Sequence, residues 1–194
     1  MGRWAPDTPG RLAKAALDLY SERGYEQTTV AEIAGRAGLT ERTYFRHYAD
    51  KREVLFAGSA ALQEVFVAAV AGAPAGTGPL RAVAAGVDAA AGMFTDRRDF
   101  ARKRHEVITA NADLLERELI KLATLSAALS AALRERGVPD PAAAVAAETG
   151  VAVFKVGFER WVAPEEIRGL PELVYDTLET LTGMAAEGAE GARA

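Results

Sequence analysis

The sequence predicts an all-α protein of about nine helices. Apolar residues recur at spacings of three and four along nearly the whole chain, which is the period of an amphipathic helix. No stretch of useful length alternates apolar and polar residues as a half-buried strand would. Alanine, the strongest helix former, is abundant, and capping residues separate the apolar runs.

Three short helices are predicted at the N-terminus. The first begins at Thr8-Pro9 and ends at Gly24, following the rule that proline starts helices and glycine ends them. Thr29 and Glu32 have the spacing of a capping box and start the second helix. Thr40 is a suitable N-cap for the third.

Six further helices are expected, with a break in the PAGTGP segment after the first of them. Asn111 is expected to cap the longest helix, which ends at Gly137, and Asp140-Pro141 repeats the cap-plus-proline pattern. The six helices are expected at about 50–71, 80–93, 97–109, 111–137, 141–161 and around 173–181.

Composition excludes several classes of protein. The 194-residue chain has no cysteine, which rules out disulfides, thiolate metal sites and a cysteine nucleophile. Its first residues contain prolines and charges rather than the apolar core of a secretory signal. The longest uncharged run, 65–80, is interrupted by glycine and proline and is shorter than the roughly 20 apolar residues of a membrane span. We therefore expect a soluble, cytoplasmic protein.

Charge is unevenly distributed along a chain whose net charge is −4. Residues 1–52 have nine basic and seven acidic side chains, whereas residues 53–194 have 14 basic and 20 acidic ones. Within 36–52, five cations stand against two carboxylates. This asymmetry indicates that the N-terminal end meets an anionic partner.

The stretch LTERTYFRHYADK (39–51) gathers aromatic and cationic residues on the third predicted helix. At 100° per residue, Tyr44 and Tyr48 share one side, while Arg46 lies opposite between Arg42 and Thr43. Phe45 and His47 flank this outward stripe. Two short helices joined at Gly38 have the layout of a helix-turn-helix, whose second helix enters the major groove of DNA. The alternative is a stabilising three-helix module with a solvated charged face.

Residues 11–55 resemble the N-terminal domain of the TetR family of bacterial transcription regulators. The resemblance is carried by Ala15-Ala16, Gly24-Tyr25, Thr28-Thr29, Ile33-Ala34, Ala37-Gly38-Leu39-Thr40, Thr43, Phe45, His47, Tyr48 and Lys51. It implies a helix-turn-helix DNA-binding domain over 1–52 and a helical ligand-binding and dimerisation domain over 53–194.

The resemblance also implies which residues contact DNA. They are Thr29, Thr40, Glu41, Arg42, Thr43, Phe45, Arg46, His47 and Lys51. An arginine can form paired hydrogen bonds with guanine in the major groove, so Arg42 and Arg46 are the candidates for reading sequence, whereas His47 and Lys51 are candidates for phosphate. Where the family usually has tyrosine, this chain has Phe45, which cannot form the phenol-to-phosphate hydrogen bond.

A small-molecule pocket is expected among the middle helices, with an apolar or amphipathic effector. Its candidate lining is Phe66, Val87, Phe94, Phe100, His105, Leu119, Leu122, Phe154 and Phe158, with Arg102 and Arg104 beside His105 at a polar end. Aromatic residues at helical spacing also build ordinary cores, so a plain hydrophobic core is the alternative.

The helix over 141–161 is apolar around much of its circumference and must be buried on more than one side. With the last helix it is expected to form a homodimer interface that places two recognition helices on a palindromic operator. The candidate interface is Ala146, Ala147, Gly150, Val153, Trp161, Leu173, Val174, Leu178 and Leu181, and a purely internal core is the alternative.

The function predicted from the sequence is a DNA-binding transcriptional regulator, a repressor released from a palindromic operator by a small molecule. No cofactor, metal or catalytic residue is expected: the chain has only two histidines, no HExxH motif and no glycine-rich phosphate loop after a strand. An enzyme and a helical scaffold without a DNA role are the alternatives.

Overall fold

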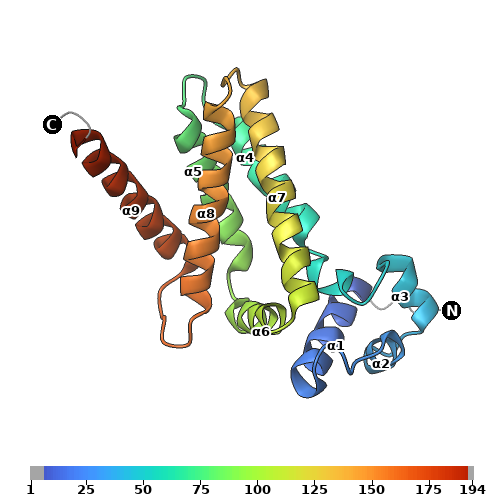
Figure 1. Ribbon diagram of the computed structural model, residues 1–194. Helices are drawn as coiled ribbons and strands as arrows, with labels where there is room; N and C mark the ends of the chain where they lie inside the picture. The colour runs from blue at the N-terminus through green and yellow to red at the C-terminus, as the bar shows by residue number, and fades with distance from the viewer. Residues whose placement is uncertain (1–6, 192–194) are drawn as a thin grey trace. The chain divides into compact units, whose positions relative to one another are not determined.

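The computed structural model describes residues 7–191, with side chains through Glu187, and this range is all-helical (Figure 1). It contains nine α-helices, two short 3₁₀-helices and no strand, which confirms the predicted fold class. The elements are α1 (Thr8–Arg23), α2 (Val30–Arg36), α3 (Glu41–His47), η1 (Glu53–Phe56), α4 (Ser59–Gly72), α5 (Pro79–Ala91), η2 (Gly92–Phe94), α6 (Arg98–Thr109), α7 (Ala112–Glu135), α8 (Ala142–Val162) and α9 (Leu170–Gly191).

The helices group into two compact units. The N-terminal unit comprises the chain through Ala60 together with Arg102–Ile120, and the C-terminal unit comprises Ala61–Ala101 and the chain from Lys121 onward. The predicted boundary at residue 52 between a DNA-binding domain and a ligand-binding domain remains a prediction. The compact units divide the chain differently, because Arg102–Ile120 packs with the first helices.

Local capping explains the starts of the first three helices. The Asp7 side chain accepts a hydrogen bond from the Gly10 backbone at 2.9 Å and caps α1. At α2, the Thr29 hydroxyl accepts from the Glu32 backbone while the Glu32 carboxylate accepts from the Thr29 backbone, so the predicted capping box is confirmed. Thr40 caps α3 as predicted by accepting from the Thr43 backbone.

The core of the N-terminal unit combines α1–α3 with a distant helical corner. Leu12, Ile33 and Tyr44 are completely buried in it. Val107 and Ile108 near the end of α6, and Leu114 near the start of α7, belong to the same cluster. The corner between α6 and α7 is therefore part of the N-terminal core.

The single helix expected at 50–71 is instead two elements separated at Ala57-Gly58. Val54, Leu55 and Phe56 of η1 are all buried in the core of the N-terminal unit, whereas α4 contributes to a different core. By length and mean hydropathy (1.8) the segment Glu53–Gly72 could cross a membrane, and it is the only such segment among the described residues. The backbone break interrupts it, and Phe66 and Val70 are buried in the core of the C-terminal unit.

One predicted helix cap is wrong. Asp140 does not cap α8, because Pro141 occupies the N-cap position without a side-chain cap, and the Asp140 carboxylate accepts a hydrogen bond from Arg134 Nε at 2.8 Å. Asn111 directly precedes α7, and its backbone carbonyl accepts a hydrogen bond from the Leu115 backbone at 2.9 Å. Its side-chain nitrogen donates to the Val107 carbonyl at 2.6 Å and so also binds the end of α6.

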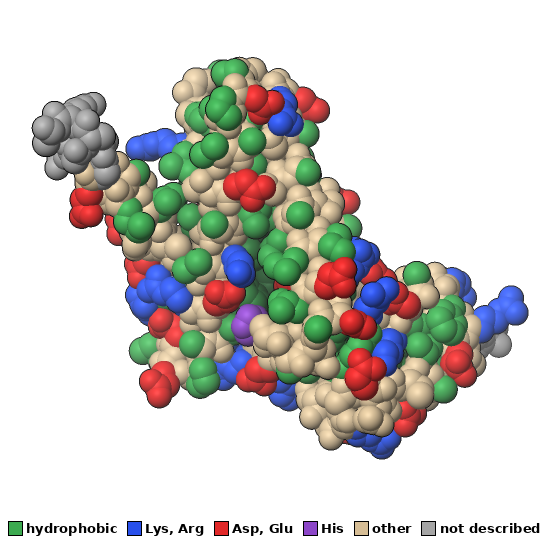
Figure 2. Space-filling view, in the orientation of Figure 1, with side chains coloured by type: hydrophobic (Ala, Val, Ile, Leu, Met, Phe, Trp, Pro, Cys, Tyr) green, Lys and Arg blue, Asp and Glu red, His purple; other side chains and the backbone are tan. Residues whose placement is uncertain are grey.

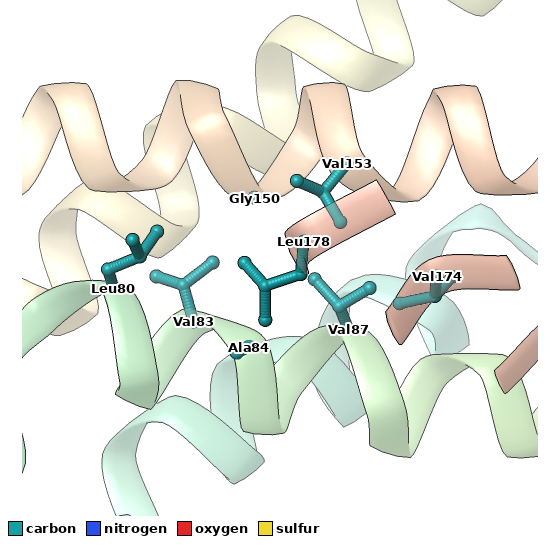
Figure 3. A pocket seen from close by; sticks show the side chains of 8 residues that line it. All are labelled: Leu80, Val83, Ala84, Val87, Gly150, Val153, Val174 and Leu178. Carbon is teal, nitrogen blue, oxygen red and sulfur yellow. The ribbon is translucent and has the colours of Figure 1, made fainter. Parts of the chain in front are cut away.

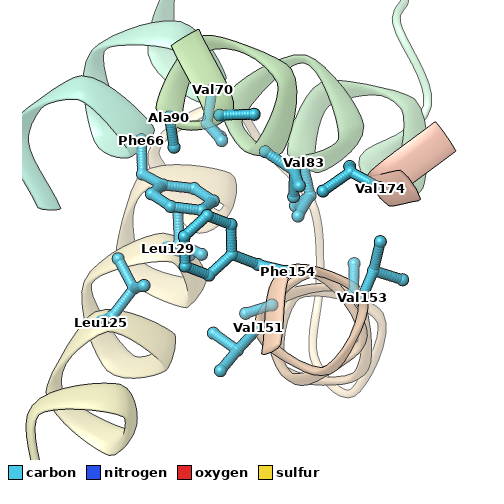
Figure 4. Close-up of a cluster of buried hydrophobic side chains, with 14 of the residues drawn as sticks. Phe66, Val70, Val83, Ala90, Leu125, Leu129, Val151, Val153, Phe154 and Val174 are labelled. Atoms are coloured by element: carbon cyan, nitrogen blue, oxygen red, sulfur yellow. The ribbon is translucent and has the colours of Figure 1, made fainter. Parts of the chain in front are cut away.

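The C-terminal unit packs α5, α8 and α9 together, with α4 and α7 completing its core (Figures 1 and 4). Phe66 from α4 and Phe154 from α8 meet edge to face, with ring centroids 5.3 Å apart. Gly150 allows the close approach of α5, because a Cβ there would lie 2.0 Å from Val83 Cγ1. The small residues of α8 therefore serve contacts within the chain.

Candidate nucleic-acid interface and ligand site

Helix α3 is held in place by its aromatic side. Tyr44 is completely buried, and its hydroxyl donates to the Asp50 carbonyl at 3.1 Å. The Tyr48 hydroxyl donates to the Pro9 carbonyl at 3.4 Å, which ties α3 to the start of α1. Both tyrosines face the core as the helical periodicity predicts, so the opposite side of α3 faces solvent.

Arg42 and Arg46 project from that solvent-facing side without any ion-pair or hydrogen-bond partner among the described side chains. Other arginines of the N-terminal unit are engaged. Arg23 pairs with Glu32 at 3.0 Å, Arg36 with Glu22 at 2.9 Å and Arg52 with Asp50 at 2.8 Å. These three arginines are thus paired with carboxylates, while the two on α3 are available to an external anion.

The remaining predicted contact residues of α3 divide into free and engaged groups. Glu41, Phe45 and His47 are exposed. Thr40 and Thr43 are engaged with each other, with their hydroxyl oxygens 3.1 Å apart, and Thr29 is engaged in the α2 capping box. The free side chains beside the two arginines are therefore a carboxylate, a phenyl ring and an imidazole.

Lys51 has a different environment from the one expected for a phosphate contact. Its ammonium donates to the Tyr25 carbonyl at 3.1 Å and to the Glu26 carbonyl at 3.5 Å. It also lies 4.1 Å from the centre of the Tyr25 ring, and the Tyr20 hydroxyl donates to the Lys51 carbonyl at 2.6 Å. Lys51 thus fastens the α3–η1 connection to the turn after α1. Residue spacing did not predict this role, because the contacts span 25 or more positions.

Burial raises the pKa values of several phenols of this unit. It raises the pKa of Tyr25 to about 12 and raises the pKa values of Tyr20 and Tyr44 well above the ordinary value. Tyr20 and Tyr44 therefore remain hydrogen-bond donors to the carbonyls that they bind. By contrast, the hydrogen bond from Arg52 lowers the pKa of Asp50, whose carboxylate also accepts from the Arg52 backbone at 2.8 Å.

Arg104 joins the α6–α7 corner to η1 inside the N-terminal unit. Its Nε donates to the Leu55 carbonyl at 2.7 Å, and its guanidinium lies 5.1 Å from the Phe56 ring centre. Its two terminal nitrogens bind the Glu118 carboxylate at 3.2 and 2.9 Å. A second ion pair links Arg117 to Glu53. Arg104 was a candidate for the polar end of a pocket, but its donors are committed to η1 and α7.

Four of the predicted pocket residues form one aromatic cluster in the C-terminal unit. Phe94 lies 5.9 Å from Phe154 and 5.5 Å from Phe158, measured between ring centroids. Phe66 contacts Phe154, and Trp161 contacts both Phe94 and Phe158. These five rings therefore pack against one another within the C-terminal unit.

The other candidate pocket residues do not lie together in one site. Val87 is buried on α5, and Leu122 packs partly buried against the core. Phe100 is 40% exposed. His105 and Leu119 belong to the N-terminal unit, so the expected lining is drawn from both units.

A small apolar hollow lies between α5, α8 and α9 (Figure 3). Val83 and Val87 of α5 face Val153 of α8 and Leu178 of α9 across it. Its full lining is Leu80, Val83, Ala84, Val87, Gly150, Val153, Val174 and Leu178. Of the candidate pocket residues, only Val87 borders it.

The candidate dimer residues pack inside the chain. Seven of the nine are buried, and Leu178 and Leu181 pack partly buried against the same core. Their burial is accounted for by an internal core, the alternative considered from the sequence. The exposed side of α8 instead presents Val145, Ala152 and Val156, which follow one another at spacings of seven and four.

Comparison with known proteins relates the N-terminal unit to regulators. Residues 12–57 match the family described as bacterial regulatory proteins, tetR family. The chain is 40% identical over 89 residues to the HTH-type transcriptional regulator TcmR of Streptomyces glaucescens. That alignment covers 46% of this chain and 39% of TcmR, so it spans less than half of either protein.

Two solved structures are similar over most of the chain. One is FadR of Thermus thermophilus, a TetR family repressor in complex with lauroyl-CoA, with 24% identity, 90% of this chain and 93% of that chain covered and a TM-score of 0.54. The other is FadR of Bacillus subtilis in complex with stearoyl-CoA, with 18% identity, 89% and 96% covered and a TM-score of 0.62. These similarities concern the fold.

Proposed function

The chain belongs to the TetR family of bacterial regulatory proteins through residues 12–57, and from this premise we propose that it is a sequence-specific DNA-binding transcriptional regulator. The observation that carries the proposal is the pair of guanidinium groups of Arg42 and Arg46 on the exposed side of α3, neither of which has a partner among the residues that the structure describes. They lie on the second helix of a helix-turn-helix, the element that enters the major groove.

The chemistry of this surface suits duplex DNA. An arginine can donate two hydrogen bonds to guanine O6 and N7, which distinguishes guanine from the other bases in the major groove. Because neither arginine has an internal carboxylate partner, binding DNA breaks no ion pair at these residues. His47 at the edge of the same surface can donate to phosphate, which positions the helix without reading sequence.

We propose that the active form is a homodimer that binds a palindromic operator. A two-fold dimer would place its recognition helices about 34–36 Å apart, one helical turn of DNA. The exposed stripe of Val145, Ala152 and Val156 on α8 supports a helix-to-helix contact, together with exposed Tyr175 on α9. Figure 2 shows hydrophobic side chains on the surface of α8 and α9, interspersed with charged ones. The candidate interface residues named from the sequence would then support this face from beneath.

We propose further that a small apolar or amphipathic effector binds the C-terminal unit and releases a repressor from DNA in the cytoplasm. The aromatic cluster of Phe66, Phe94, Phe154, Phe158 and Trp161 supports an apolar ligand. Because the two FadR structures are complexes with acyl-CoA esters, an acyl chain is the first effector to try. An effector of this kind acts only if it binds one arrangement of the recognition helices more tightly than the other.

The proposal is tested by titrating the protein with the DNA upstream of its own gene and with scrambled DNA of equal length at several salt concentrations. A regulator binds the native sequence much more tightly, with an affinity that falls steeply as salt rises. A helical scaffold without a DNA role would bind both duplexes weakly and equally, which would contradict the proposal.

A further inference from the structure

Phe45 is the large apolar side chain that α3 exposes to solvent. It is 53% exposed, whereas Tyr44 and Tyr48 on the same helix are buried. Its ring meets the Tyr44 ring edge to face at 5.7 Å, and the remaining surface of the ring is uncovered. Single exposed apolar residues are common on proteins, so its significance depends on what surrounds it.

Arg42 and Glu41 lie one helical turn before Phe45, three and four residues away, and Arg46 follows Phe45 directly in the sequence. Neither Arg42 nor Arg46 has an ion-pair or hydrogen-bond partner among the described residues. Side chains three apart on a helix have Cβ atoms only about 5–6 Å apart. Any surface that covers the Arg42 guanidinium therefore also covers part of the Phe45 ring.

The chemistry of a phenyl ring restricts what it can recognise in the proposed complex. It has no hydrogen-bond donor or acceptor, so it can bind neither a phosphate oxygen nor a polar base edge by a conventional hydrogen bond. In the major groove, the apolar group that base pairs present is the 5-methyl group of thymine.

We propose that Phe45 is a specificity-determining residue that recognises the 5-methyl group of a thymine in each operator half-site. This inference rests on the proposed DNA-binding function and adds a base that the arginines do not read. Because Arg42 and Phe45 lie one helical turn apart on the same helix, this thymine is expected close to the guanine read by Arg42.

The test uses a duplex that the wild-type homodimer itself selects from a random-sequence library. Each thymine is replaced in turn by uracil, which removes the 5-methyl group and keeps the pairing edge. At one thymine position in each half-site, the uracil substitution should raise the Kd of the wild-type protein by up to about fourfold relative to the unsubstituted duplex. This is the effect of losing one buried methyl group. Phe45→Ala should bind the thymine and uracil forms of that duplex equally.

Matched variants separate this effect from a change in folding. Phe45→Leu keeps an apolar side chain and should retain the preference for thymine, whereas Phe45→Gln keeps a similar length without it and should lose the preference. Met184→Ala removes an exposed apolar side chain from α9, outside the recognition surface, and should leave the preference for thymine unchanged. Circular dichroism establishes that each variant is folded.

Two results would overturn the inference by itself. One is a Phe45→Ala protein that retains the wild-type preference for thymine at every position, and the other is a wild-type protein that shows no preference at any thymine near the guanine. If the wild-type protein selects no sequence from the library, the proposed function fails and the inference fails with it.

Discussion

The Arg104 guanidinium and the Glu118 carboxylate form a bidentate ion pair, with nitrogen–oxygen distances of 3.2 and 2.9 Å. Arg104 also donates to the Leu55 carbonyl, so the α6–α7 corner is bound to η1. Together with buried Val107 and Ile108, this pair makes the corner a structural part of the N-terminal unit.

Arg104→Gln should destabilise the N-terminal unit by about 1–3 kcal/mol, because Glu118 and the Leu55 carbonyl lose a charged donor in a mostly buried setting. Amide hydrogen exchange at α1–α3 measures this as faster exchange. Lys103→Gln, on the exposed side of α6, is the matched control and should exchange as the wild type does. Unchanged exchange in Arg104→Gln would mean that the corner does not support the unit.

Arg42→Ala and Arg46→Ala should each weaken binding to the selected operator by about 1–3 kcal/mol and relax specificity at one base pair, because each removes a two-pronged contact to guanine. Competition binding against operators altered at single base pairs measures both effects. Arg36→Ala is the matched control, since Arg36 is already paired with Glu22 and should lose little. Equal losses in all three variants would contradict base reading by α3.

Lys51→Ala should weaken binding to all DNA sequences alike, because the α3–η1 connection loses its anchor to the turn after α1. The ammonium is occupied by carbonyls, so the slope of log Kd against log salt should stay at its wild-type value. A direct phosphate contact would instead reduce that slope by about 0.9. A reduced slope with unchanged thermal stability would contradict the anchoring role.

The N-terminal unit should lose stability in acid, in part through Asp50. The Arg52 hydrogen bond lowers the pKa of Asp50 in the folded state below its unfolded value of about 3.9. The folded state therefore binds fewer protons, and the stabilisation is present above about pH 4 and lost as pH falls through the folded pKa.

Thermal melts followed by circular dichroism between pH 3 and 7 measure this effect. At pH 7, Asp50→Asn should have a lower Tm than the wild type, and this difference in Tm should narrow toward pH 3. Glu41→Gln is the control, because the Glu41 carboxylate is exposed and has no partner among the residues of known placement. A constant gap between Asp50→Asn and the wild type would refute this contribution.

Sequence reasoning succeeded where the determining interactions are local. The Thr29–Glu32 capping box and the Thr40 cap join residues three positions apart, and the division of α3 into a buried tyrosine side and an exposed arginine side follows from helical periodicity. The break between η1 and α4 was missed, because its local signal, Gly58, is a residue that a continuous helix can also contain.

Contacts between distant residues could not be predicted in the same way. Arg104 and Glu118 are 14 positions apart, and Lys51 meets Tyr25 across 26 positions, so no spacing rule identifies either pair. The sequence correctly predicted that Gly150 on α8 is buried. It could not predict whether Gly150 packs against α5 of the same chain or against a second copy, because helical periodicity shows which side of a helix is buried and not which element covers it. Val83 on α5 is that partner within the chain.

Selection of DNA from a random-sequence library, carried out in parallel with the wild type and an Arg42→Ala/Arg46→Ala double variant, tests the central claim most directly. The account predicts that the wild-type protein enriches a palindrome with guanine in half-sites about 10 base pairs apart, while the folded double variant enriches no sequence. Enrichment of the same palindrome by the double variant, or of no sequence by the wild type, would contradict it.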